Sequence, residues 1–312
     1  MSPRVLFLFW DGVGLGEAGP QNPLATLRLP AIERLAGGQR WTAGADAVRQ
    51  PDHVFVPVDA TLGVDGLPQS GTGQAALFTG EDAVRLHGRH FGPYPPTAVR
   101  SVVAQRSVFA RLVAAGVSPG RLAFANAYPD RFFRAVEARG RWTVTTLAAH
   151  AAGVRLRGAA DLAAGRALPA DLTGETWRRL LDPEHEPTDE AEAARRLASL
   201  LDRHAFVLSE YFLTDKAGHS RDADRARDVL QSLDRFVGAL LARLDPARDL
   251  LVLSSDHGNL EDLSVKSHTR NPVPLVALGP GAGRFAGARS ILDVTPSVAG
   301  VLTGAEGAFR EP

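Results

Sequence analysis

The chain of 312 residues contains no cysteine. This absence excludes a disulfide bond, a thiolate metal site and a cysteine nucleophile, so any metal has to be held by histidine, aspartate, glutamate or hydroxyl groups. Lysine is almost missing as well, because Lys216 and Lys266 are the only two and every other basic residue is arginine. We attribute this bias mainly to genome composition, although arginine also suits phosphate recognition.

The sequence shows neither an excess of one charge nor a long apolar run. Its 35 basic and 35 acidic residues cancel, which indicates neither a nucleic-acid partner nor a membrane partner. The apolar run 5–10 ends at Asp11 and is too short for a signal peptide, and no stretch approaches the length of a membrane span. We therefore expect a cytoplasmic protein without a nucleic-acid or membrane partner.

The distribution of apolar runs predicts an α/β fold. Runs that are apolar on both faces are typical of buried parallel strands, and they occur at residues 4–10, 54–58, 204–212, 250–253 and 273–278. An amphipathic helix is expected over residues 222–244 and a final helix over 293–302. Because 312 residues exceed the usual size of one domain, we expect one large domain and one smaller domain.

Residues 87–196 differ in character from the rest of the chain. They are rich in arginine, glycine and alanine, with strand signals only at 122–127 and 142–146 and with amphipathic helices near 172–181 and 190–203. We expect a core domain of residues 1–88 and 200–312, and an inserted cap domain of residues 89–199. Cap residues that could face a substrate are Arg89, His90, Asn126, Tyr128, Arg131 and Arg134, although surface arginines are more often solvated charges.

Polar clusters follow several of the expected strands. Asp11 follows the strand 4–10, and Asp256 and His257 follow the strand 250–253. Ligands of open α/β folds lie at the carboxyl ends of strands, so these side chains are expected to face a site. The alternative is an aspartate cap with loop histidines. For Asp11 a dinucleotide-binding loop is a further alternative, but its glycines have the spacing G-x-G-x-G and no helical pattern follows at once.

Two further clusters complete a set of metal-ligand types. Asp215 and His219 follow the strand 204–212 and are four residues apart, so they can meet at one metal if the intervening residues form a single turn. His268 lies shortly after the Asp256 cluster. Six ligands are thereby available, which is enough for two metal ions.

A hydroxyl group is expected at the start of a helix. A turn-rich segment leads to Ser70, and residues 75–78 look helical. The N–H groups and the positive dipole end of a helix stabilise an alkoxide or a bound phosphate. The simpler alternative is that Ser70 or Thr72 only caps the helix.

Taken together, these segments resemble the alkaline phosphatase superfamily, and within it the branch of cofactor-independent phosphoglycerate mutase and phosphopentomutase. The similar segments are Leu-Phe-Trp-Asp-Gly-Val-Gly at 8–14, Gln-Ser-Gly-Thr-Gly at 69–73, Asp-Lys-Ala-Gly-His at 215–219, Asp-His-Gly-Asn at 256–259 and His-Thr-Arg-Asn-Pro-Val-Pro at 268–274. They span nearly the whole chain in the family's order. The resemblance implies a three-layer, alkaline-phosphatase-like core with a mostly parallel sheet and an inserted α+β cap.

The resemblance also implies roles for the residues. One metal ion would be held by Asp215, His219 and His268. The other would be held by Asp11, Asp256 and His257 together with Ser70. Ser70 matches the covalent nucleophile of the family, and Thr72 is the second candidate. Manganese or zinc is expected and magnesium is less favoured, because histidine is among the ligands.

The activity implied is phosphoryl transfer to and from a small phosphorylated metabolite through a phosphoserine. The chain departs from the family pattern at Thr72, where the branch usually has another residue, and at Gln74, where it has histidine. A phosphomutase is the leading hypothesis, and a phosphomonoesterase or phosphodiesterase is the alternative. A non-catalytic metal-binding relative is the alternative from another class of protein.

Overall fold

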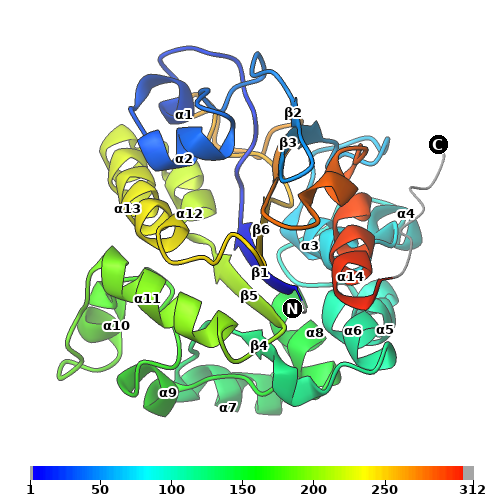
Figure 1. The fold of residues 1–312 in the computed structure, drawn as a ribbon, viewed down its shortest axis with the longest axis vertical. Coiled ribbons are helices and arrows are strands. Elements are labelled where there is room, and N and C mark those ends of the chain that lie inside the picture. The colour runs from blue at the N-terminus through cyan, green and yellow to red at the C-terminus, as the bar shows by residue number, and fades with distance from the viewer. Residues whose placement is uncertain (1–2, 305–312) are drawn as a thin grey trace.

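A seven-stranded mixed sheet forms the centre of the computed structural model, which describes residues 3–304 (Figure 1). The strand order is β2-β3-β7-β6-β1-β5-β4. Five strands run in one direction, while β7 and β2 run in the opposite direction. The expected α/β fold with a mostly parallel sheet is therefore confirmed. The bounds are β1 Arg4–Trp10, β2 Val48–Arg49, β3 His53–Val58, β4 Leu122–Phe124, β5 Phe206–Tyr211, β6 Asp249–Ser254 and β7 Val273–Leu278.

Strand β1 lies inside the sheet between β6 and β5, and all seven of its residues are buried. Side chains alternate between the two faces of a strand, so Val5, Phe7 and Phe9 enter one core, and Leu6 and Leu8 enter the other. Helices cover both faces and give three layers (Figure 1). The first core includes residues of α3 Ser70–Thr79, α5 Thr97–Arg106, α6 Val108–Ala114, α8 Val144–Ala151 and α14 Val294–Thr303.

The second core lies on the opposite face of the sheet. It includes residues of α1 Pro23–Thr26, α2 Pro30–Leu35, α11 Glu190–Leu201, α12 Leu213–Ser220 and α13 Ala223–Leu241. The longest of these helices, α13, buries an apolar stripe through Leu230, Leu233 and Leu240, as its amphipathic pattern predicts. No helix within residues 3–304 combines the length and the apolarity needed to cross a membrane.

The expected insertion, residues 89–199, packs largely on the main sheet. Strand β4 pairs in parallel with β5, and α5, α6 and α8 share the core that contains Phe7 and Phe9. A small cluster of Ala127, Leu162, Ala167 and Trp177 is separate from both cores. It lies among α7 Asp130–Arg139, α9 Ala159–Ala163 and α10 Glu175–Leu180. A distinct cap is thus not shown, and its boundaries stay a prediction.

The strand expected at 142–146 is wrong. Thr143 instead accepts a hydrogen bond from the backbone N–H of Thr146 and caps helix α8. Threonine and valine favour strands when their neighbours are strands, but a threonine hydroxyl can also satisfy the open N–H groups at a helix start. The cap therefore outweighed the β-branched pattern. The strand expected at 122–127 is shorter than predicted, because β4 ends at Phe124.

Truncation of Phe109 tests whether the insertion and the sheet unfold together. Phe109 of α6 packs edge-to-face on Phe206 of β5, with ring centroids 5.3 Å apart. Because this contact lies inside the shared core, Phe109→Ala is expected to lower the free energy of unfolding by about 3–5 kcal/mol in one cooperative transition. Leu86→Ala is the control, since Leu86 is 54% exposed and should change stability little. Urea unfolding that splits into two transitions would instead show a separately folding insertion.

Candidate active site

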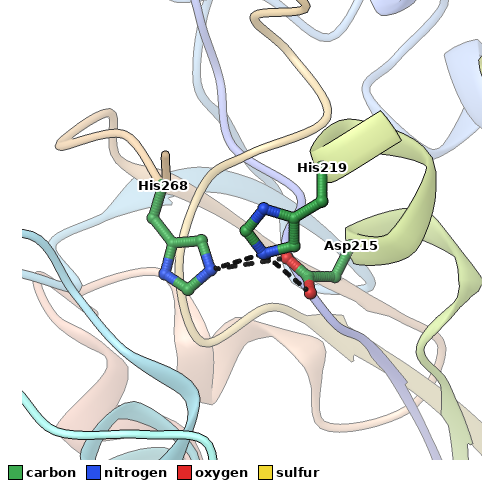
Figure 2. A group of neighbouring side chains, drawn as sticks. All are labelled: Asp215, His219 and His268. Carbon is green, nitrogen blue, oxygen red and sulfur yellow. Dashed lines mark hydrogen bonds and ion pairs between the residues drawn. The ribbon is translucent and has the colours of Figure 1, made fainter. Parts of the chain in front are cut away.

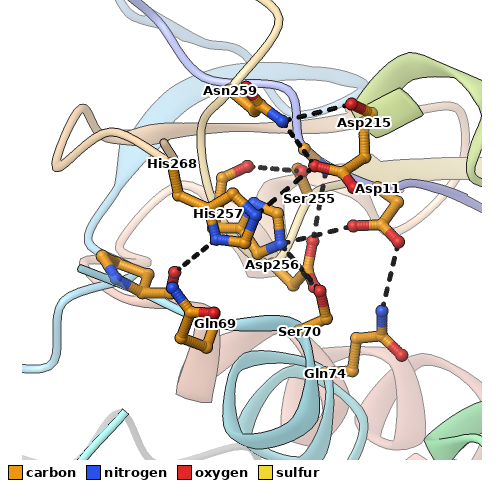
Figure 3. Close-up of polar contacts among 12 residues, drawn as sticks. Asp11, Gln69, Ser70, Gln74, Asp215, Ser255, Asp256, His257, Asn259 and His268 are labelled. Atoms are coloured by element: carbon orange, nitrogen blue, oxygen red, sulfur yellow. Dashed lines mark hydrogen bonds and ion pairs between the residues drawn. The ribbon is translucent and has the colours of Figure 1, made fainter. Parts of the chain in front are cut away.

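The predicted site residues meet at the carboxyl ends of neighbouring strands of the sheet (Figure 3). Asp11 directly follows β1, Asp256 and His257 follow β6, and Asp215 lies in the first turn of α12, which comes after β5. These three strands are parallel neighbours, so their carboxyl ends lie side by side. Ser70 begins helix α3 at the same place. The structure brings together all six predicted ligands and the predicted nucleophile.

Asp215, His219 and His268 form the first group (Figure 2). The two Nε2 atoms of His219 and His268 are 3.1 Å apart. Asp215 adds its carboxylate, with Oδ2 3.4 Å from Nε2 of His219 and Oδ1 3.6 Å from Nε2 of His268. The single turn of α12 between Asp215 and His219 is the one that the four-residue spacing predicts.

The backbone fixes which nitrogen of each ring faces the group. Nδ1 of His219 lies 2.8 Å from the carbonyl oxygen of Lys266, and Nδ1 of His268 lies 2.7 Å from that of Pro68. A carbonyl only accepts, so each Nδ1 donates and each neutral ring has its lone pair on Nε2. Two lone pairs that face each other beside a carboxylate need a cation or a proton between them. The group therefore fits a divalent metal ion.

Asp11, Asp256, His257 and Ser70 form the second group. Nε2 of His257 lies 3.0 Å from Oγ of Ser70, 3.4 Å from Oδ1 of Asp11 and 3.5 Å from Oδ2 of Asp256. Within residues 3–304, Oδ1 of Asp11 and Oδ2 of Asp256 are buried without a hydrogen-bond partner. Such oxygens are costly to bury unless a cation compensates them. Asp11, His257 and Asp215 can also share one ion, which places Asp215 between the two groups.

The surroundings of the second group disfavour its own charges. Burial raises the pKa of Asp11 well above its usual range, and the Asp256 carboxylate adds to the shift. Burial and then Asp215 raise the pKa of Asp256 to about 7. Burial, followed by His268, lowers the pKa of His257 well below its usual range. Crowded carboxylates beside neutral imidazoles form a site that lacks positive charge, and bound metal ions would supply it.

Ser70 and Thr72 point in different directions from the first turn of α3. Oγ of Ser70 faces His257. Thr72 is fully buried, and its hydroxyl accepts a hydrogen bond of 3.1 Å from the N–H of Phe91, while its own N–H donates to the Phe91 carbonyl at 2.9 Å. Neither residue caps the helix, because the N-cap position is Gln69 and has no side-chain cap. The arrangement favours Ser70 as the nucleophile.

Gln74 occupies the position at which the family has histidine. It is buried on α3, and its Nε2 lies 3.4 Å from Oδ2 of Asp11 (Figure 3). The amide thus donates a long hydrogen bond to a ligand of the second group. The departure from the family pattern keeps a donor at this place.

The expected cap contacts are not assembled around Ser70. Arg89 and Arg131 are exposed, and Nε2 of His90 lies 3.3 Å from the carbonyl oxygen of Val64. The amide of Asn126 donates to the carbonyl of Glu210 at 2.7 Å and accepts from its N–H at 2.8 Å. Asn126 therefore continues the pairing of β4 with β5. Among the described residues, none of these four shares a hydrogen bond or an ion pair with the six ligands.

Glu210 is a buried acid that the sequence analysis missed. It is the penultimate residue of β5, and Thr145 donates a hydrogen bond of 2.7 Å to its Oε2. Burial raises the pKa of Glu210 to about 7, and its charge contributes to the raised pKa of Asp11. A glutamate within an otherwise apolar strand signal was the clue that could have revealed it.

Glu261 is the second missed residue, and it ties the loops of the site together. Its Oε2 accepts from the N–H of Gly14 at 2.9 Å and from the N–H of Asn259 at 2.8 Å. Its Oε1 accepts from the side chains of Asn271 and Thr269. Asn259 in turn donates to Oδ1 of Asp215 at 2.7 Å. One carboxylate thus holds the loop after β1 to two parts of the loop between β6 and β7.

Comparisons with known proteins show which proteins the chain resembles. Residues 168–303 match the family model described as the Metalloenzyme superfamily. The chain is 32% identical over 146 residues to the 2,3-bisphosphoglycerate-independent phosphoglycerate mutase of Halobacterium salinarum, covering 41% of this chain and 28% of that protein. It is 44% identical over 64 residues to the phosphopentomutase of Chromohalobacter salexigens, covering 20% and 15%. The matched segments thus span 28% of the length of the first relative and 15% of the length of the second.

Solved structures support the fold over nearly the whole chain. The PH0037 protein from Pyrococcus horikoshii superposes with a TM-score of 0.58 at 14% identity, covering 99% of both chains. The alkaline phosphatase from the Antarctic bacterium TAB5 gives a TM-score of 0.57 at 15% identity, covering 97% of this chain and 99% of that one. The alkaline-phosphatase-like fold is confirmed, and so is the resemblance to the Metalloenzyme superfamily. The Asp11 and Ser70 segments lie outside the range that the family model matches.

Metal analysis tests the two groups separately. We expect metal-stripped protein to take up two manganese ions per chain, and His219→Ala to keep only one, because it loses a ligand of the first group alone. Elemental analysis after dialysis measures the count. His150→Ala is the control, since His150 is exposed on α8 and should leave two ions bound. Two ions retained by His219→Ala would contradict the assignment.

A second prediction concerns Glu210. Its pKa lies at about 7 in the folded protein, against 4.5 as an ordinary carboxyl, so folding binds a proton in this range. The stability contributed by protonated Glu210 is lost as the pH rises from about 4.5 through 7. Relative to wild type, Glu210→Gln should therefore gain about 3 kcal/mol of stability between pH 4 and pH 8. Urea unfolding in EDTA at both pH values checks this. If the difference in stability between Glu210→Gln and wild type does not change with pH, Glu210 is more exposed to solvent than the structure indicates.

Proposed function

We propose that the protein transfers phosphoryl groups of small phosphorylated metabolites through a covalent phosphoserine at Ser70, with two divalent metal ions. The observation that carries the proposal is the position of the Ser70 hydroxyl, at a helix start and 3.0 Å from Nε2 of a predicted metal ligand, His257. The mutase and phosphatase names of the relatives and structural neighbours are consistent with it.

The residues of both groups suit the metal ions. Asp215, His219 and His268 would hold one, and Asp11, Asp256 and His257 with Ser70 would hold the other. Carboxylate and imidazole donors favour manganese or zinc over magnesium. When bound, such ions lower the pKa of a hydroxyl and neutralise charge on a phosphoryl group.

The protein supplies the orientation of the nucleophile. Ser70 is the first residue of the ten-residue helix α3, and the amide groups at such an end favour phosphoryl oxygens. Glycine is required at position 71, because a Cβ there would lie 2.7 Å or less from the carbonyl oxygens of Phe91 and Tyr94. The segment 91–94 therefore packs closely against the start of the helix that carries Ser70.

The proposed reaction consists of two phosphoryl transfers, one to Ser70 and one from it. The Ser70 oxygen forms a P–O bond while the ester P–O bond of the substrate breaks, and the hydroxyl proton is released as the departing alkoxide takes a proton from water. In the second transfer, the oxygen of water or of another hydroxyl of the retained alcohol forms a new P–O bond while the bond between phosphorus and the Ser70 oxygen breaks. The attacking oxygen loses its proton, and the Ser70 oxygen takes one up. Water makes the protein a phosphatase, and the second hydroxyl makes it a mutase.

A substrate screen tests the activity and separates these outcomes. Manganese-loaded protein is incubated with a panel of phosphorylated sugars, glycerates and nucleotides, and released phosphate and isomeric product are measured side by side. Isomer without phosphate would identify a mutase, and phosphate alone a phosphatase or diesterase. No turnover with two metals bound would identify a non-catalytic relative and sink the proposal.

Substitution of Ser70 tests the nucleophile. Ser70→Ala should reduce turnover at least about 10³-fold, because the covalent step is lost. It should also abolish labelling of the peptide around residue 70 with the phosphoryl group of the substrate, which is measured after an acid quench. Thr72→Val is the matched control, since its hydroxyl is engaged by Phe91, and it should still form the phosphoserine. Labelling that persists in Ser70→Ala but disappears in Thr72→Val would transfer the role to Thr72.

A further inference from the structure

An arginine-lined cleft lies away from the Ser70 site. It has a volume of about 450 Å³ and is formed by the turn before β4, the segment 155–166 and the C-terminal part of α11. Gly120 precedes β4 and His204 precedes β5. The cleft therefore lies toward the amino ends of these parallel strands, whereas the Ser70 site lies beyond the carboxyl ends of β1, β5 and β6. Helix α9, which lies within the segment 155–166, is at the bottom of the view in Figure 1, below α11.

The cleft carries a concentrated positive charge. Among residues 3–304, no acidic residue lines it and six arginines do; they are Arg155, Arg157, Arg166, Arg195, Arg196 and Arg203. Two carboxylates beside the cleft, Asp161 and Glu192, form ion pairs with four of these arginines. Six cations against two anions leave an excess of four positive charges, in a chain whose net charge is zero.

The two carboxylates orient the arginines. Asp161 binds both Nη atoms of Arg155, at 2.7 and 2.8 Å, and Glu192 binds Nε and Nη2 of Arg195, at 2.6 and 2.7 Å. These hydrogen bonds lower the pKa of Asp161 and of Glu192 to about 2, so both acids are ionised at neutral pH. The guanidinium groups are thus held in fixed positions around the cleft.

Arg157 and Arg203 lack such partners. Arg157 is only 7% exposed and donates to two neutral carbonyls, that of Phe124 at 2.7 Å and that of Arg166 at 2.9 Å. Burial and the neighbouring Arg155 lower the pKa of Arg157 to about 10. Arg203 is exposed, and in residues 3–304 neither arginine forms an ion pair. A buried cation that repels its neighbours is stabilised when an anion enters.

We infer that this cleft binds a small polyanion with two or more phosphoryl groups, at a site separate from Ser70. Arginine presents a planar fork that matches phosphate oxygens, and the volume is in the range of small-ligand pockets. Among the described residues, the lining contains no phenylalanine, tyrosine or tryptophan ring on which a nucleobase could stack, so the ligand is recognised by its phosphates. Solvation would explain the exposed Arg166 and Arg203, but it does not explain Arg157, which is buried in the same cleft.

Titration with pyrophosphate tests the site on metal-stripped protein in EDTA. Calorimetry should show one pyrophosphate per chain, bound more weakly as salt is added. The double variant Arg166→Glu/Arg203→Glu should weaken binding at least tenfold. Both side chains are largely exposed, and an unchanged thermal midpoint confirms folding. The control Arg139→Glu/Arg179→Glu makes the same charge change at exposed positions outside the cleft and should bind within twofold of wild type.

A second pair of measurements separates this site from the proposed active site. Ser70→Ala/His219→Ala should bind pyrophosphate as wild type does, and hydrogen exchange should slow in 155–166 and 195–204 when pyrophosphate is present. Equal binding by the cleft variant and wild type would overturn the inference. So would loss of binding in Ser70→Ala/His219→Ala. A single-stranded oligonucleotide that binds through the cleft more tightly than pyrophosphate would replace the small polyanion by a nucleic acid.

Discussion

A shortage of positive charge at the ends of three neighbouring strands is the constraint on which the structure depends. The buried carboxylates of Asp11 and Asp256 lie beside the half-buried carboxylate of Asp215, and the imidazole of His257 is held neutral there. Such a cluster is unfavourable by itself. The sheet makes it unavoidable, because β1, β5 and β6 run parallel as neighbours and each delivers its acid at the same edge.

The surrounding polar residues keep this unfavourable cluster in place. Glu261 accepts hydrogen bonds from two backbone N–H groups and two side chains, which belong to the loop after β1 and to the loop between β6 and β7. Asn259, which Glu261 binds, donates a hydrogen bond to Asp215. The Thr214 hydroxyl donates to the carbonyl of Asp11 at 2.6 Å. The precision of a metal site comes from such supporting contacts as much as from the ligands. Glu261 is therefore as integral to the site as the residues that would bind a metal ion.

The ligands could be predicted from the sequence because they follow strands, and strands can be recognised from short apolar runs such as that ending at Asp11. The supporting residues could not, since their roles depend on contacts across the fold; Glu261 meets Gly14, which is 247 positions away. Local competition explains the other error, at Thr143, where a hydroxyl cap prevailed over β-branched neighbours. The mixed sheet was predictable in type, whereas the packing of α5, α6 and α8 onto it was not.

The facing imidazoles of His219 and His268 give the first group the form of a cross-link. Their Nε2 atoms are 3.1 Å apart with both lone pairs directed inward, so the two neutral rings repel each other unless a cation lies between them. A metal ion bound by both rings would tie helix α12 to the loop between β6 and β7, two segments that are 49 positions apart in the chain. Removal of such an ion would therefore loosen the contact between these two segments as well as empty the site.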